Sequence, residues 1–244
     1  MAGRGGLALV SLACASDCLG VGAAPAEVFS ALRAHLAAAS DAAIGADFPV
    51  SLAAALIGKP GWRSFVTGFP ARFPDAEAFR AWCAAHVDER GGRRLCDREA
   101  RTPFAAHNLR LYRQTWSGLA HLVGPLLAEG RIAVPPLTEP LPDRAWLLET
   151  CPASALLHLG LREPYKGREA TRRAGRRRIL EALIDRGWLE APARPTRSLM
   201  LEDTGGDALD AAIAAAAAAR AVLNGDSLLP RAAIEAVEGR VYFT

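Results

Sequence analysis

Lysine is scarce in this chain of 244 residues, where it occurs only at positions 59 and 166. Most of the positive charge is therefore arginine, whose planar guanidinium suits phosphate and carboxylate because it can donate two parallel hydrogen bonds to them. The formal net charge of +3 is too small to identify a nucleic-acid partner. Composition leaves the ligand open, since high arginine and alanine content is equally typical of a GC-rich coding sequence.

Cysteine pairs with metal-binding spacing are also missing. The five cysteines, at positions 14, 18, 83, 96 and 151, are odd in number and show neither the CxxC nor the Cys/His spacing of a zinc site. Such a pattern favours a reduced, cytoplasmic protein. The apolar segment 7–15 after Arg4 has the pattern of a short signal peptide, but secretion fits poorly with unpaired thiols. We therefore expect a buried strand there.

No apolar run is long enough to cross a membrane. The longest one in the last predicted helix, 211–219, is far shorter than the ~20 residues that a spanning helix needs. A P-loop is absent too, and segment 20–25 lacks the third glycine of a dinucleotide-binding loop. With 51% hydrophobic residues, the chain can build one α/β core. We expect a single soluble domain over residues 1–244, without a membrane partner and with an oligomeric state that the sequence leaves open.

The order of apolar segments predicts an α/β protein in which helices cover a sheet. Strands are expected at 7–13, briefly at 19–21, in the two segments that end at Asp47 and Glu149, and as a closing strand or hairpin arm at 238–243. Helices are expected at 25–39, in a helical insertion at about 74–130 that is broken at 91–92, at 152–160, at 176–188 and at 207–222. The alanine-rich face of the last helix should let it approach the sheet closely.

Acidic residues stand where two strands end and one helix begins. Asp47 and Glu149 end the two predicted strands, and Asp207 and Asp210 share the first turn of the last helix. Clustered carboxylates repel one another unless a proton or a cation neutralises them. Oxygen ligands from several elements suit Mg²⁺ or Mn²⁺, which can support phosphodiester hydrolysis. The sequence thus predicts a metal site, although each acid alone also fits a helix cap or a strand end.

Basic residues supply candidate phosphate ligands. Two segments are rich in arginine, 90–101 and 162–178. Most of these side chains are equally well explained as a solvated helix face. Lys166 differs, because it lies in a predicted loop after the strand of Glu149, where its ammonium could reach a substrate phosphate.

Motifs spread from Asp47 to the C-terminus resemble those of a known family. They are GADFP at 45–49, AFRAWC at 78–83, RLCD at 94–97, NLRLYRQT at 108–115, ETCPAS at 149–154, PYKG at 164–167, GGDALDA at 205–211 and EGRVYF at 238–243. In this order and spacing, the chain resembles domain-of-unknown-function family 429, a group predicted to be nucleases of ribonuclease-H-like fold. Fold alone does not determine function.

The resemblance implies a ribonuclease-H-like mixed sheet flanked by helices, and a metal-dependent nuclease or phosphohydrolase acting on nucleic acid or a phosphate ester. It places the Mg²⁺ or Mn²⁺ ligands at Asp47, Glu149, Asp207 and Asp210, which with Lys166 form the expected catalytic set. The residues expected to bind substrate are Arg94, Arg110, Arg113 and Lys166.

One departure from the family pattern affects the predicted site. Similar chains open with a strand that ends in an aspartate, and here the sequence begins after that segment. Asp17 follows the 7–13 strand and is a poor substitute. We expect that the true start codon lies upstream, with an inactive member as the alternative. Two other functions stay open: a nucleotide-binding phosphotransferase of related fold, and a scaffold whose acids are structural.

Overall fold

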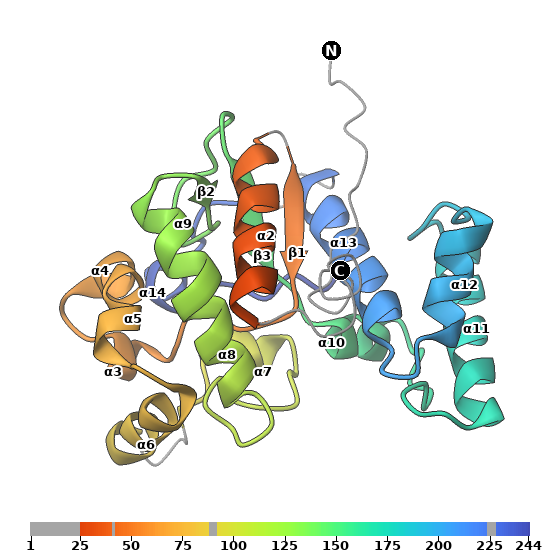
Figure 1. Cartoon of the computed structure of the whole chain (residues 1–244), viewed down its shortest axis with the longest axis horizontal. Coiled ribbons are helices and arrows are strands. Elements are labelled where there is room, and N and C mark those ends of the chain that lie inside the picture. Colours follow the sequence, from red (N-terminus) through yellow and green to blue (C-terminus); the bar gives the residue numbers. More distant parts are fainter. Residues whose placement is uncertain (1–24, 41, 88–91, 224–227) are drawn as a thin grey trace.

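The protein is described by a computed structural model over residues 25–40, 42–87, 92–223 and 228–244. It is an α/β structure in which helices flank a small parallel sheet (Figure 1). The strands are β1 (Ala43–Ala46), β2 (Ile132–Ala133) and β3 (Ala145–Glu149). The helices are α2 (Pro25–Ala38), α3 (Ala54–Ile57), α4 (Gly61–Thr67), α5 (Phe69–Arg72), α6 (Ala76–His86), α7 (Leu95–Glu99), α8 (Tyr112–Gly118), the π-helix η1 (Leu119–Val123), α9 (Gly124–Ala128), α10 (Pro152–His158), α11 (Ala170–Asp185), α12 (Arg194–Glu202), α13 (Asp207–Leu223) and α14 (Glu235–Glu238).

The three described strands pair in the order β1-β3-β2, and both pairings are parallel. Parallel neighbours need a long crossover connection, and the helices from α3 to α9 supply it between β1 and β3. The mixed sheet expected from the sequence is therefore not seen among the described strands. The strands predicted at 7–13 and 19–21, like Asp17, lie outside the described residues.

The two faces of the sheet pack against different helices. Leu147 of β3 faces a large core shared with α2, α4, α6 and α9, whereas Leu148 faces α13 and Tyr242. This alternation follows from the period of two along a strand. Figure 1 shows α2 crossing in front of β3 and α13 standing beside β1, and both neighbours are in contact with these strands.

Several predicted elements occur close to their expected places, and others differ. The last helix begins at Asp207 as predicted, and α11 starts earlier than the expected position 176. Helix α12 was not expected. The closing segment 238–243 forms an isolated parallel bridge between Thr150 and Tyr242 rather than a regular strand, because the α14 helix occupies its beginning. No described helix combines the length and the hydrophobicity that crossing a membrane requires.

Helix α13 approaches β1 unusually closely at Gly45. A Cβ atom added to Gly45 would lie 2.2 Å from the backbone oxygen of Ala214, a distance that real side chains do not tolerate. Small residues are needed on both sides of this contact: glycine on the strand and the alanine run of α13, whose residues 212–218 are buried. The close approach brings the first turn of α13 to the end of β1.

We expect Gly45→Ala to destabilise the protein by about 3 kcal/mol, because both colliding groups belong to the backbone and neither can rotate away. Urea unfolding followed by circular dichroism measures the change. Gly160→Ala is the control: its φ of +68° strains an alanine, at a cost of about 1 kcal/mol, but the added Cβ meets open space. Equal losses in the two variants would show that close packing at Gly45 contributes nothing.

Candidate functional site

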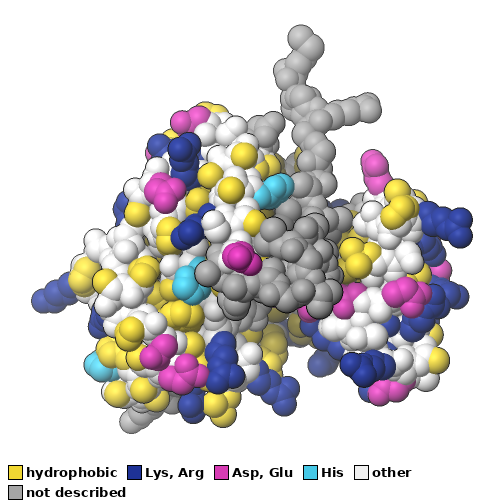
Figure 2. Space-filling view, viewed as in Figure 1, with side chains coloured by type: hydrophobic (Ala, Val, Ile, Leu, Met, Phe, Trp, Pro, Cys, Tyr) yellow, Lys and Arg dark blue, Asp and Glu magenta, His cyan; other side chains and the backbone are white. Residues whose placement is uncertain are grey.

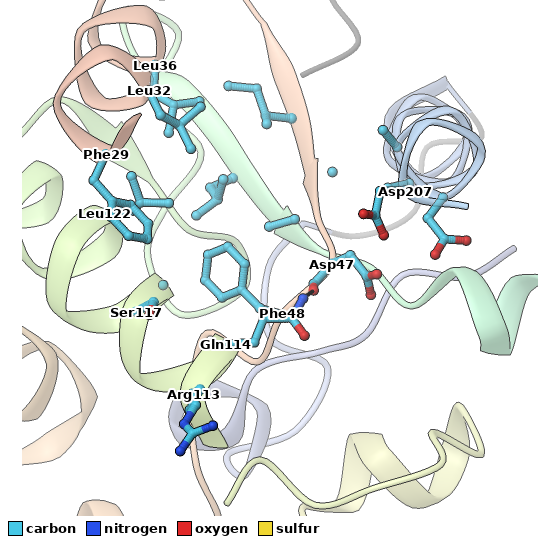
Figure 3. Close-up of a pocket in the computed structure, with 18 residues that line it drawn as sticks. Phe29, Leu32, Leu36, Asp47, Phe48, Arg113, Gln114, Ser117, Leu122 and Asp207 are labelled. Atoms are coloured by element: carbon cyan, nitrogen blue, oxygen red, sulfur yellow. Dashed lines mark hydrogen bonds between the residues drawn. The ribbon is translucent and has the colours of Figure 1, made fainter. Parts of the chain in front are cut away.

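A pocket of about 570 Å³ runs beside β1, on the side away from β3 (Figure 3). One side is apolar, with Phe29, Leu32 and Leu36 of α2 facing it. The other side carries the acids at the end of β1 and the start of α13. The described residues that line it are Phe29, Leu32, Leu36, Ile44, Gly45, Ala46, Asp47, Phe48, Arg113, Gln114, Ser117, Gly118, Leu122, Leu147, Asp207, Asp210, Ala211 and Ala214. A pocket of this size, mostly apolar with a few converging polar groups, has the usual character of a ligand site.

Asp47 directly follows β1, and the side-chain amide of Gln114 donates a hydrogen bond to its backbone carbonyl. The residue is exposed at the pocket, yet protein atoms crowd its carboxyl group. Loss of hydration, followed by repulsion from Asp210, raises the pKa of Asp47 from 3.8 to about 7, and Lys166 opposes this rise. Solvent in the pocket screens part of these effects, so the upward direction of the shift is what supports a crowded acidic site.

Asp210 receives two partners from a single loop. The Tyr165 hydroxyl donates to Oδ1 at 2.6 Å, and the Lys166 ammonium lies 2.6 Å from Oδ2. Burial raises the pKa of Asp210, while Lys166 and Tyr165 act to lower it. Burial also acts to lower the pKa of Lys166, but the charge of Asp210 outweighs it and leaves that pKa raised. We regard the pair as ionised, because the lysine side chain is 53% exposed and keeps much of its hydration.

Asp207 lies on the same turn of α13 as Asp210 and also lines the pocket, but its side chain is exposed. The start of this helix is fixed by Asp203, whose carboxylate accepts hydrogen bonds from the backbone of Gly205 at 3.0 Å and of Ala208 at 2.8 Å. Asp203 therefore acts as the helix cap. Asp203 thus takes the capping role that the sequence allowed for Asp207, and Asp210, which the same alternative made a solvated residue, is buried.

Glu149 does not join the other three acids in the pocket. Its register partner on β1 is Ala46, and both side chains lie on the sheet face opposite α13. The carboxylate is buried and accepts hydrogen bonds from Arg94 at 2.7 and 2.5 Å and from the Val50 backbone at 3.0 Å. Three of the four predicted acids thus line the pocket, whereas Glu149 is paired with Arg94, although its charge still acts on Asp47.

Arg94 is fully buried and joins Glu149 to Asp97 and the backbone of Glu238. Burial acts to raise the pKa of Asp97, but the charge and hydrogen bonds of Arg94 outweigh it and leave the pKa lowered. The Glu238 carboxylate in turn accepts from the first backbone groups of α3 and α7, at Ala54 and Leu95. Arg94, predicted to bind substrate, is enclosed by this network and does not line the pocket.

The other two predicted substrate arginines lie on the surface. Arg113 reaches the pocket rim, although its guanidinium is paired with Glu77 at 2.8 Å. Arg110 lies over the ring of Phe104 and is not among the residues that line the pocket. Of the expected substrate ligands, Lys166 is closest to the acids and Arg113 lies at the rim.

The pocket acids can supply only one or two ligands to a divalent cation, not a full coordination shell. Among the described residues, no group of three or more His, Cys, Asp or Glu side chains is arranged to hold a metal ion. Magnesium, however, is often held by one or two carboxylates, with waters and substrate phosphates completing its shell. Loss of hydration, followed by repulsion from Asp210, raises the pKa of Asp47, and a bound cation would relieve the repulsion. Asp47 and Asp210 therefore fit as such a pair of ligands.

Two contacts at the site were not predicted from the sequence. Tyr165 donates to Asp210, and Gln114 fixes the backbone of Asp47. Both residues belong to motifs that the sequence displays, PYKG and NLRLYRQT. Their adjacency to Lys166 and Arg113 was the available signal, but the direction in which each side chain points depends on the folded backbone.

Asp47→Asn should stabilise the protein increasingly as the pH rises. The folded-state pKa of Asp47 lies above its ordinary value, so the folded protein binds this proton more tightly than the unfolded chain does. Its contribution to stability is thus complete below about pH 4 and lost as the pH rises through 7. Thermal unfolding at pH 4.5, 6 and 8 tests this against Asp185→Asn, an exposed control. A pH-independent difference from the wild type would contradict the shift.

Comparison with known proteins gives one match. Neither the curated proteins nor the solved structures include one that matches this chain. The matched segment contains Glu149, Lys166, Asp207 and Asp210 but not Asp47. Residues 125–234 match the family described as "Protein of unknown function (DUF429)", the family that the sequence motifs indicate.

Proposed function

We propose that this protein is a metal-dependent hydrolase that cleaves phosphodiester bonds in nucleic acid or in a related phosphate ester. The supporting observation is the gathering of Asp47, Asp207 and Asp210 at one pocket, where the pKa of Asp47 is raised to about 7. Carboxylates held together with too little positive charge favour the binding of a divalent cation. A perturbed acid in a pocket is also a general indicator of a functional site.

The proposed ligands of Mg²⁺ or Mn²⁺ are Asp47 and Asp210, with Asp207, one turn of α13 before Asp210, acting through water. When bound, the cation would supply an activated water and stabilise the leaving oxygen. Lys166, at Asp210, and Arg113, at the pocket rim, would orient the substrate phosphate. Glu149 is assigned a supporting role, since its hydrogen bond to Val50 fixes the chain just after Asp47.

We further propose that the described strands are part of a ribonuclease-H-like sheet. We also propose that the protein is cytoplasmic. Support comes from the parallel β1–β3 pair, from α13 packed on it with acids in its first turn, and from the free thiols of Cys83, Cys96 and Cys151. One observation favours a non-catalytic scaffold instead: Lys166 already provides Asp210 with a positive partner.

Calorimetric titration with Mn²⁺ and a cleavage assay together test the proposal. The wild type should bind Mn²⁺ and cleave short DNA or RNA, or bis(4-nitrophenyl) phosphate, in the presence of Mn²⁺ but not of EDTA. Binding without cleavage of any substrate would leave a metal-binding scaffold. Absence of both binding and cleavage would refute the hydrolase.

A further inference from the structure

Arg176 is a buried arginine whose hydrogen bonds go to backbone carbonyls. It is 2% exposed on α11, and no carboxylate among the described residues lies within ion-pair distance of it. Its Nε donates to the carbonyl of Leu201 at 2.8 Å, and its Nη1 donates to those of Tyr165 at 2.5 Å and Gly167 at 3.2 Å. Burying a charge is costly unless hydrogen bonds satisfy it, so this arrangement requires the carbonyls to stay in place.

The same loop is held from its other sides as well. Gly167 donates its backbone N–H to the carbonyl of Thr204 at 2.8 Å. Gly175 packs so closely that an added Cβ would lie 2.5 Å from the carbonyl oxygen of Pro164. Gly206 faces the Tyr165 ring, where an added Cβ would lie 2.9 Å away. The backbone around Lys166 is therefore fixed by contacts with α11 and with the segment before α13.

The carbonyls that Arg176 binds lie on either side of Lys166. Lysine is a long side chain with many rotamers, and this one is half exposed, yet its ammonium lies 2.6 Å from Asp210. Holding the two flanking peptide groups fixes where the lysine stem begins and in which direction it leaves the backbone. Tyr165, whose carbonyl is one of the two, donates its hydroxyl to the same carboxylate.

We propose that Arg176 is a positioning residue: by binding the carbonyls of Tyr165 and Gly167, it holds the Lys166 ammonium and the Tyr165 hydroxyl on Asp210. Other arginines of α11 lie nearer the surface and pair with acids, as Arg173 does with Glu202 and Arg178 with Glu163. Figure 2 shows basic and acidic side chains interspersed over the part of the molecule that holds α11 and α12. This positioning role follows from the contacts of Arg176 alone. Its importance for catalysis rests on the proposed function.

Limited acylation of amines followed by mass spectrometry tests the positioning without any activity assay. The chain has only two lysines, so the exposed Lys59 is an internal reference for Lys166 in the same molecule. In Arg176→Gln we expect the ratio of Lys166 to Lys59 labelling to rise about fivefold, because the ammonium leaves its contact with Asp210 and becomes more accessible to the reagent. Arg173→Gln, on the same helix, should leave the ratio at the wild-type value.

Gly175→Ala provides a second variant in case Arg176→Gln does not fold. It leaves Arg176 intact, but its added Cβ would collide with the carbonyl oxygen of Pro164 and displace the loop. The ratio of Lys166 to Lys59 labelling should therefore rise as well. An unchanged ratio in Gly175→Ala and in any folded Arg176→Gln would overturn the proposal. A raised ratio in a protein that neither binds Mn²⁺ nor cleaves phosphodiesters would keep the positioning role and reject only the hydrolase.

Discussion

Asp210→Asn is expected to reduce metal-dependent phosphodiester cleavage by about 10²–10³-fold, as the loss of several kcal/mol of charge stabilisation at the reaction centre implies. Asparagine has nearly the same shape as aspartate but no negative charge. It would remove one proposed metal ligand and also the ionic partner of Lys166. Initial rates in Mn²⁺, with calorimetric titration of the same samples, measure both effects.

Asp185→Asn is the matched control for this experiment, because Asp185 is exposed at the end of α11, away from the pocket lining. It should retain wild-type rate and Mn²⁺ affinity. Asp207→Asn should have a smaller effect than Asp210→Asn, since Asp207 is exposed and less confined. If Asp210→Asn cleaves as fast as the wild type, the acids at the pocket are not a metal site.

Arg94→Met is expected to destabilise the protein by about 3–5 kcal/mol, the usual cost of removing one partner from a buried ion pair. The methionine would leave Glu149 and Asp97 buried without their shared cation. It would also leave the Glu238 carbonyl without the guanidinium donor. Urea unfolding at pH 7 measures the loss, and Arg98→Met, an exposed change on α7, the short helix that Arg94 precedes, should cost less than about 1 kcal/mol.

A double variant tests whether the loss of stability in Arg94→Met comes from the unpaired charge of Glu149. In Arg94→Met/Glu149→Gln, one of the unpaired buried charges is gone, so the combined cost should be smaller than the sum of the two single costs. Additive costs, or a loss of less than about 1 kcal/mol in Arg94→Met, would show that the network stabilises little.

Asp47 and Glu149 show which features of the site can be predicted from the sequence. Both acids end apolar strand segments, and both positions were predicted correctly as strand ends. The face on which each lies depends on register, and a shift of one residue moves every side chain of a strand to the other face. The sequence pattern predicts the two acids in one site, whereas the observed register places Glu149 with Arg94 and Asp47 near α13.

Lys166 and Arg176 show the same limit from the basic side. The sequence indicated Lys166 because it stands alone in a loop, but Arg176 was one of many arginines in 162–178. Only the packing of α11 against α12 and α13 turns this arginine inward while Arg173 and Arg178 stay at the surface. Neighbouring residues on a helix point about 100° apart, so the buried position depends on which face meets the core.

By itself the sequence determined the α/β class, the acid-bearing start of α13, the alanine run that lets this helix reach Gly45, and the motifs that resemble the family matched by residues 125–234. These are local properties, set by periodicity, capping and residue size. The tertiary structure alone decided that three acids share a pocket, that the fourth pairs with Arg94, and that Arg176 holds the loop of Lys166. Those outcomes depend on strand register and helix packing between segments far apart in the chain, which no local pattern specifies.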